Sequence, residues 1–299
     1  MTVADNSDSS ELTCTLLLLV ATPAEEKGLK EAAAACAIPW KKVKNTEFRL
    51  DIEHYFDLGP VGNQSRVIAL PPSKDASRNL VMGSIGYFGT AARAMRFRQV
   101  TRAFAVVQVG MAFGIAPEWQ KLGDVLVATS LIPYDNRDIK PARRGRLARW
   151  VCGEGSVTEY NQVVREPARL ELVELFRKEQ NRRRQPPRDN SSFDVHLGAL
   201  LSGSARIHYR HFRDELVRSV PWEPDLIVGG EMEGVGLLAA SDSWDDPVWC
   251  VVKGISDFAD EDRDAVIKAS RPVACRNAGE FVLSALINDT RSEEVNTGE

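Results

Sequence analysis

The chain has 299 residues, 43% of them hydrophobic, and a formal net charge of -4 at pH 7. This length can bury the core of one large α/β domain or of two smaller domains. The weak negative charge provides no basic field, so nucleic acid is not expected as a partner.

The first long apolar run, Leu16 to Val20, follows an acidic segment and is far too short to span a bilayer. We therefore expect a cytoplasmic protein without a membrane partner. The cysteines are odd in number and show no CxxC spacing, which predicts reduced thiols without a disulfide framework or a zinc site. No GxGxxG follows the first apolar run, so an NAD-dependent Rossmann enzyme is a weak alternative. We expect no cofactor and no metal.

Apolar runs alternate with helical segments between two polar tails at residues 1–12, predicted to be disordered, and 291–299. Strands are predicted at 13–21, 47–58, 65–70, 80–85, 103–109, 122–129, 196–207, 226–228 and 248–255. Helices are predicted at 23–36, 86–97, 165–184, 208–220, from 231 onward, and at 264–287. Most strands are continuous apolar runs and no internal repeat is visible. This pattern predicts a single α/β domain over 13–290 with a mixed, mainly parallel sheet.

The most informative stretch is 226–260. A short apolar strand leads through Gly229-Gly230 into Glu231-Met232-Glu233-Gly234, and a second strand ends in Ser256-Asp257. Ligands in open α/β sheets gather at the carboxyl ends of strands. Two glutamates at the start of a helix also fit an ordinary charge preference. On a regular helix, positions 231 and 233 point to nearly opposite sides, so at most one of them would face a pocket squarely.

EMEG at 231–234 and GISDFAD at 254–260 resemble the paired signature of the nucleoside phosphorylase and nucleosidase superfamily. That superfamily includes methylthioadenosine/adenosylhomocysteine nucleosidase, purine nucleoside phosphorylase and AMP nucleosidase. The resemblance covers about residues 13–290, with a basic region at 137–195 the least similar part. It implies a three-layer α/β/α sandwich with a twisted central sheet, and a homo-oligomer built from dimers or trimers.

Two further segments are similar to the nucleosidases. Their first strand is followed by a Glu, and counting from Ala21 this residue is Glu25. The run from Gly110 to Gly114 matches the glycine-rich turn that family members place beneath the ribose. Without the resemblance, Glu25 fits an acidic helix start and the glycine run fits a tight turn.

Cleavage of a ribose–purine bond requires a proton donor for the base, groups that orient the sugar, and a nucleophile at C1′. By resemblance, Asp257 is the general acid at N7, Glu233 accepts hydrogen bonds from the ribose hydroxyls, and Glu25 holds and deprotonates the attacking water. The resemblance further implies a set of substrate-binding residues: Gly110, Met111, Ala112, Met232, Glu231, Ser256, Arg206, Phe258, Tyr134 and Arg137.

The sequence favours hydrolysis over phosphorolysis. Phosphorylases that resemble this chain carry an arginine after the first strand and an Arg-x-Gly-Ser element at the glycine-rich turn. Here these places hold Ala24-Glu25 and the run 108–111, Gln-Val-Gly-Met. Glu25 would repel a phosphate where one should bind. A phosphate-dependent purine nucleoside phosphorylase stays an alternative.

The substrate is predicted to be a purine nucleotide. Arg206 stands where the nucleosidases have an aromatic residue against the base, and its guanidinium plane can also stack. The basic residues of the 137–149 segment would hold phosphates near the sugar 5′ end; they are Arg137, Lys140, Arg143, Arg144, Arg146 and Arg149. Their other interpretation is a solvated surface.

A charged 5′ group favours release of adenine from AMP or ATP. Superfamily members that cleave nucleotides act in AMP turnover or as bacterial anti-phage effectors that deplete ATP, so a nucleotide-depleting defence role is one expectation. A methylthioadenosine/adenosylhomocysteine nucleosidase is an alternative, as is a non-catalytic nucleotide sensor. The presence of Glu25, Glu233 and Asp257 together argues against the sensor, because a binder needs neither acid nor base.

Overall fold

The computed structural model describes residues 12–45, 52–74, 77, 79–141, 156–160, 165–185, 193–220, 226–243 and 245–289. Nearly all of both predicted tails lies outside these ranges. The same holds for four arginines of the predicted phosphate segment: Arg143, Arg144, Arg146 and Arg149.

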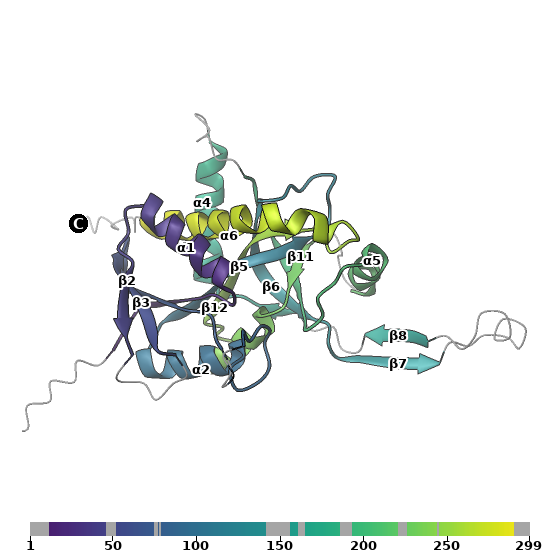
Figure 1. Cartoon of the computed structure of the whole chain (residues 1–299), viewed down its shortest axis with the longest axis horizontal. Coiled ribbons are helices and arrows are strands. Elements are labelled where there is room, and N and C mark those ends of the chain that lie inside the picture. Colours follow the sequence, from purple (N-terminus) through teal and green to yellow (C-terminus); the bar gives the residue numbers. More distant parts are fainter. Residues whose placement is uncertain are drawn as a thin grey trace, which may run out of the picture.

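A mixed sheet forms the centre of the described chain (Figure 1). Its strands are β1 (Leu16–Leu19), β2 (Lys41–Lys44), β3 (His54–Val61), β4 (Gln64–Leu70), β5 (Ala105–Gly114), β6 (Val125–Pro133), β9 (Glu166–Pro167), β10 (Val195–Ser202), β11 (Ile227–Glu231) and β12 (Trp249–Asp257). The order across the sheet is β11-β10-β6-β12-β5-β1-β4-β3-β2, and β9 pairs with β6. Strands β1, β5 and β12 are parallel neighbours, so their carboxyl ends meet at one edge.

The sheet also closes on itself. Strand β11 pairs in parallel with β10 and in antiparallel fashion with β5, where Gly230 lies opposite Phe113. Together with β6 and β12, these strands form a ring. The curl carries the end of β11 to the carboxyl ends of β5 and β12, although β11 runs against β5. This geometry places the EMEG segment beside the end of the ISD segment.

Helices cover both faces of the sheet, which confirms the predicted three-layer fold (Figure 1). They are α1 (Pro23–Ala35), α2 (Thr90–Thr101), α4 (Leu170–Arg184), α5 (Arg210–Ser219), α6 (Arg263–Ile287) and the 3₁₀ helix η2 (Gly234–Ala240). Helices α1 and α6 pack together on one face, and α2 packs with η2 on the other.

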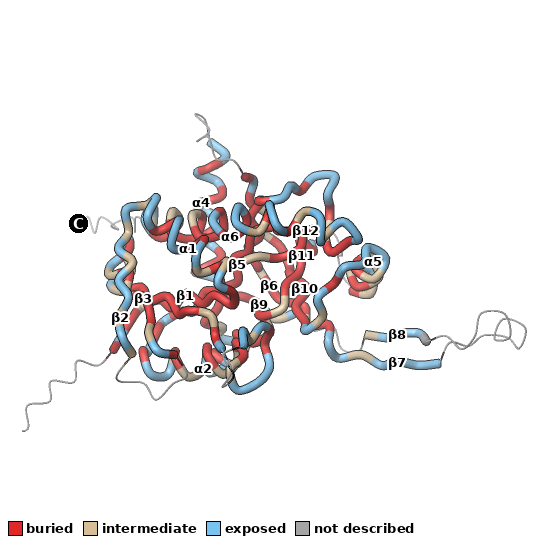
Figure 2. The backbone as a smooth tube through the Cα atoms, in the orientation of Figure 1, coloured by how far each residue is buried: buried red, intermediate tan, exposed pale blue. Residues whose placement is uncertain are grey.

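Burial follows the sequence pattern. All residues of β1, β11 and β12 are buried, as expected for strands that are covered on both faces (Figure 2). Helix α1 begins with a complete capping box between Thr22 and Glu25, with Pro23 at its first turn. No helix in the described part of the chain combines the length and apolar character needed to cross a membrane.

Several predicted boundaries are wrong. Residues 80–85 form a loop with one isolated bridge, because Gly83 and Gly86 adopt positive φ angles of 89° and 103° that a strand does not accommodate. The predicted glycine turn after residue 109 is a continuation of β5 to Gly114. Strand β10 ends at Ser202 instead of 207. No helix begins at Glu231, which ends β11, and η2 begins at Gly234.

A two-stranded sheet of β7 (Arg137–Pro141) and β8 (Ser156–Tyr160) extends away from the body (Figure 1). Arg137 and Lys140 lie on this arm. The ammonium group of Lys140 pairs with the carboxylates of Asp138 and Glu159. The described part of the predicted phosphate segment is therefore separated from the sheet edge where β1, β5 and β12 end.

Candidate active site

One cavity of about 500 Å³ lies at this edge of the sheet. Its walls come from the start of α1, the 80–82 loop, the ends of β5, β11 and β12, the segment after β10, and the first turns of α6. Nine of the predicted site residues line it: Glu25, Met111, Ala112, Arg206, Glu231, Met232, Glu233, Ser256 and Asp257. The structure thus brings the three predicted catalytic carboxyl groups into one cavity.

Four predicted site residues do not line the cavity. A side chain at Gly110 would overlap with the Glu25 carboxylate, so this glycine permits the close approach of α1 to β5. The buried Tyr134 donates a hydrogen bond to the Ala205 carbonyl over 3.2 Å. Phe258 packs against the core, and Arg137 lies on the β7–β8 arm.

Glu25 combines a structural contact with a place in the cavity wall. One carboxylate oxygen accepts hydrogen bonds from the N–H groups of Ala21 and Thr22, at 2.7 and 2.8 Å. The other accepts one from the Met111 N–H at 3.0 Å. The helix-start interpretation of Glu25 is therefore correct, and the same contacts fix the position of its carboxylate in the cavity wall.

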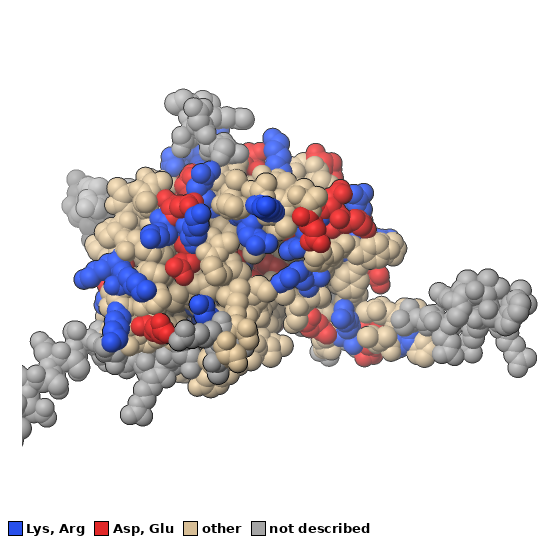
Figure 3. Space-filling model, viewed as in Figure 1, with Lys and Arg blue, Asp and Glu red and all other residues tan. Residues whose placement is uncertain are grey.

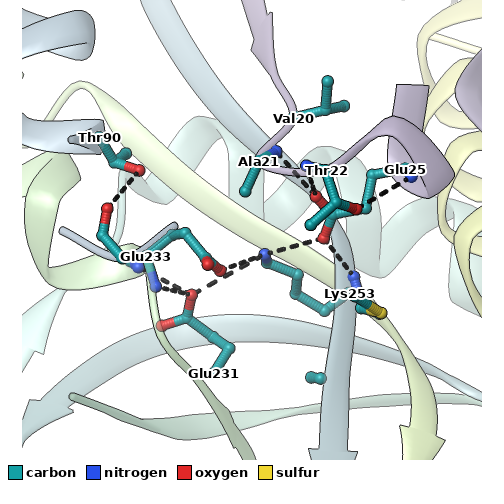
Figure 4. A network of polar contacts seen from close by, with 12 residues as sticks. Val20, Ala21, Thr22, Glu25, Thr90, Glu231, Glu233 and Lys253 are labelled. Carbon is teal, nitrogen blue, oxygen red and sulfur yellow. Dashed lines mark hydrogen bonds and ion pairs between the residues drawn. The ribbon is translucent and has the colours of Figure 1, made fainter. Parts of the chain in front are cut away.

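A fully buried lysine joins three glutamates (Figure 4). The ammonium nitrogen of Lys253 lies 3.0 Å from a Glu233 carboxylate oxygen, 3.6 Å from Glu25 and 3.9 Å from Glu231. Burial alone lowers the pKa of Lys253, but the three carboxylates outweigh burial and raise this pKa above its usual value. The three carboxylates therefore favour the protonated, cationic form of Lys253.

Sequence reasoning missed Lys253, although a signal was present. It is the single charged residue in the run WCVVKGIS, which is otherwise apolar or small and forms a strand buried on both faces. A lysine at such a position is almost never buried unless it is paired. Such a position therefore predicts an acidic partner, and the structure provides three carboxylates on neighbouring elements.

The two glutamates of EMEG have different surroundings. The Glu231 carboxylate is fully buried and accepts hydrogen bonds from the N–H groups of Glu233 and Gly234, at 2.8 and 2.7 Å. Burial raises the pKa of Glu231, Lys253 opposes this shift and Glu233 adds to it. Both glutamates line the cavity; Glu231 also supports the turn, and the Glu233 side chain retains 9% of its exposure.

Asp257 ends β12 on another wall of the cavity. Burial raises the pKa of its carboxyl above the usual Asp range, against the lowering effects of the Ala259 N–H, Arg263 and Ser256. The Ser256 hydroxyl donates a hydrogen bond to Oδ2 over 2.9 Å, and the Ala259 N–H donates one to Oδ1 over 3.0 Å. Ala259 adopts the left-handed region, with a φ of 50°. A carboxyl group in this environment favours its proton and is suited to act as an acid.

Arginines line the wall on the side of α6 and the β10–α5 segment: Arg206, Arg263 and Arg271. Only Arg206 was singled out from the sequence. In Figure 3 this face is hollowed below α6, with acidic atoms inside the hollow and basic side chains on its rim. Within the described ranges, no group of three or more His, Cys, Asp and Glu side chains has the arrangement of a metal site.

Comparisons with known proteins agree with this fold. The family model of the phosphorylase superfamily matches residues 15–287. A curated relative, the death domain-containing ATP nucleosidase of Amphimedon queenslandica, is 28% identical over 200 residues, which are 62% of this chain and 34% of the relative. The match thus covers about a third of that relative's length.

Solved structures share the fold at low sequence identity. A 5′-methylthioadenosine/S-adenosylhomocysteine nucleosidase from Neisseria meningitidis, in complex with methylthio-immucillin-A, has a TM-score of 0.63 and 18% identity, covering 91% of this chain and 98% of that one. The futalosine hydrolase of Helicobacter pylori has a TM-score of 0.61 and 14% identity, covering 92% and 97%. At these identities the likeness establishes the fold alone.

Proposed function

The chain belongs to the phosphorylase superfamily, and we propose that it hydrolyses the N-glycosidic bond of a purine nucleotide, releasing adenine from AMP or ATP. The observation that carries this proposal is one cavity with two kinds of carboxyl group. Asp257 has a raised pKa, whereas Glu25 and Glu233 lie against the Lys253 cation. Two titratable groups in contrasting environments indicate separate acid and base roles.

Each carboxyl group has one step in the proposed reaction. Asp257 gives its proton to N7 of the purine, so the base departs without negative charge as the C1′–N9 bond breaks. Glu233 accepts hydrogen bonds from the ribose hydroxyls and orients the sugar. Glu25 orients a water molecule, whose oxygen bonds to C1′ and whose proton passes to the Glu25 carboxylate. The backbone donors around Glu25 fix the direction of attack.

Water, and not phosphate, is the proposed nucleophile. The segment between β1 and Glu25 provides no arginine, and the Glu25 carboxylate stands where an anionic nucleophile would approach. Three buried glutamates face one buried lysine here, so a phosphate dianion in the position of the attacking nucleophile, next to Glu25, would be repelled. A neutral water molecule meets no such repulsion.

Adenine nucleotides are the proposed substrates for two reasons. The curated relative carries the name of an ATP nucleosidase. Arginines also line the cavity, which suits a ligand with phosphate groups. A nucleotide-depleting role in defence against viruses is part of the proposal. Cells that produce the wild-type chain should lose ATP, and cells that produce an Asp257→Asn variant should not.

The test is chromatography of the purified protein after incubation with ATP, AMP, adenosine and methylthioadenosine in phosphate-free buffer. Free adenine from a nucleotide supports the proposal. Adenine from methylthioadenosine alone would assign the chain to salvage of that nucleoside. A reaction that starts only when phosphate is added would replace hydrolysis with phosphorolysis, and no release from any of the four would favour the sensor.

A further inference from the structure

The three arginines of the cavity wall are not equivalent. Arg263 lies 3.5 Å from the Asp257 carboxylate and 3.4 Å from Asp264. Arg206 is exposed, and its guanidinium contacts the Met82 sulfur at 3.8 Å. Arg271 is half-buried, its Nε atom is buried, and it has no acceptor or acidic partner among the described residues.

An arginine without an anion is unusual in such a place. Removing a guanidinium N–H from water without an acceptor costs free energy, and buried charges in proteins are normally paired. Within the described part of the cavity wall, Arg271 combines partial burial with the lack of a partner. A ligand with an anionic group would satisfy it.

Neighbouring contacts fix the turn of α6 that carries Arg271. The Ser270 hydroxyl donates hydrogen bonds to the carbonyl of Ser256 on β12 and to the carbonyl of Val266. A side chain at Gly254 would overlap with the Ala274 carbonyl, so strand and helix are in close contact. The turn of α6 that carries Arg271 therefore packs against β12, the strand that carries Lys253 and Asp257.

Arg271 lies on the Glu25 side of the cavity. A side chain at Gly28 would overlap with Cys275, so α1 and α6 touch one helical turn beyond Arg271, and the start of α1 lies beside it. Burial raises the pKa of the Cys275 thiol; Glu25 raises it further, whereas Lys253 and Arg271 lower it. Arg263 is eight residues earlier on α6, about 12 Å along the helix axis, and faces Asp257.

We propose that Arg271 binds the 5′-phosphate of the substrate and makes the site selective for nucleotides over nucleosides. This inference rests on the proposed function. With the base at Asp257 and the attacking water at Glu25, the ribose lies between them, and Arg271 on the Glu25 side lines the same cavity and can meet a charged group that the ribose carries. The guanidinium fork suits bidentate contacts to a phosphate. Arg271 takes the role that the sequence assigned to the 137–149 segment.

The kinetic test compares Arg271→Met with Arg276→Met, an exposed arginine on the same helix that does not line the cavity. Methionine preserves much of the apolar stem and removes the charge. For Arg271→Met we expect kcat/KM for AMP to fall about 10- to 100-fold, as for loss of a charge-assisted hydrogen bond. The value for adenosine should change less than about twofold, and Arg276→Met should match the wild type. Equal losses for both substrates, or no loss for AMP, would overturn the inference.

A binding measurement separates this inference from the proposed function. In an Asp257→Asn background, AMP should raise the unfolding temperature more than adenosine does, and adding Arg271→Met should remove the difference. If the wild type cleaves no purine compound but shows this Arg271-dependent stabilisation by AMP, the proposed function fails and the phosphate site stands. If the wild type releases adenine while Arg271→Met leaves the AMP effect intact, the function stands and the phosphate site fails.

Discussion

The cavity contains buried carboxyl groups on two sides, near Lys253 and at Asp257, and they are stabilised in different ways. On one side, three glutamates share a buried lysine, and backbone N–H groups complete the contacts of Glu25 and Glu231. On the other side, Arg263 stands 3.5 Å away from Asp257, and burial prevails. The comparison teaches that carboxyl groups in one cavity can have contrasting electrostatic surroundings. The carboxylates around Lys253 share a buried cation, whereas at Asp257 burial outweighs the neighbouring donors.

The largest expected effect comes from removing the acid. Asp257→Asn keeps the size of the side chain but removes the proton, so kcat for adenine release should fall about 10²- to 10⁴-fold. Asp260→Asn is the comparison variant: Asp260 is also buried, lies three residues away and does not line the cavity, but it adds to the raised pKa of Asp257, so its effect on kcat should be much smaller and not zero. Full activity of Asp257→Asn would show that Asp257 is not the general acid.

The next effect comes from removing the cation. Lys253→Met leaves three carboxylates without their buried partner, and we expect a loss of about 3–5 kcal/mol in the free energy of unfolding. Urea denaturation measures this quantity. Lys253→Arg retains the positive charge and should lose less. If Lys253→Met were as stable as the wild type, the cluster would not depend on its cation.

The pH dependence of stability distinguishes the two sides further. Because the folded-state pKa of Asp257 is raised, the folded state binds this proton more tightly than the unfolded state. Stability attributable to Asp257 is therefore full below its unfolded pKa of about 3.9 and falls as pH rises through the folded pKa. Asp257→Asn should be more stable than the wild type at pH 7, and the gain should shrink toward pH 4. Denaturation at several pH values tests this, and an unchanged difference across the range would contradict it.

The smallest effect is expected outside the cavity. Asp124 is buried and lies 3.0 Å from His196, and the N–H groups of Lys121 and Asp194 also donate to it. Burial raises the pKa of Asp124, but these donors outweigh it and lower the pKa overall. Asp124→Asn should cost about 1–3 kcal/mol of stability above pH 4, decreasing as pH falls through the folded pKa, with kcat unchanged. A large loss of kcat would place Asp124 in the catalytic machinery.

The motifs at strand ends could be predicted from the sequence, because residues that follow buried parallel strands meet at one edge of the sheet. Glu25, Glu233 and Asp257 each follow an apolar run, and the structure gathers them in one cavity. The closure of β11 onto β5 was not predicted, because antiparallel pairing across a curled sheet leaves no mark in the local pattern. The largely apolar segment 80–85 is predicted as a strand, but positive φ angles at Gly83 and at Gly86, which directly follows the segment, make it a loop.

Lys253 and Arg271 show the limit of reading motifs alone. Lys253 directly precedes the GISDFAD run and is not part of that motif, so the motif does not predict its role. Arg271 belongs to a helix whose place over the cavity depends on contacts of Ser270 and Ala274 with β12. Those contacts are tertiary, and no spacing in the sequence encodes them.

The most direct test of the central claim is the mass of the sugar product formed from AMP in buffer that contains phosphate. Hydrolysis with Glu25 at the nucleophile predicts ribose 5-phosphate with a free C1′ hydroxyl, alongside one adenine per molecule consumed. A product with a second phosphate on C1′ would contradict the account, because phosphate instead of water would then have attacked C1′.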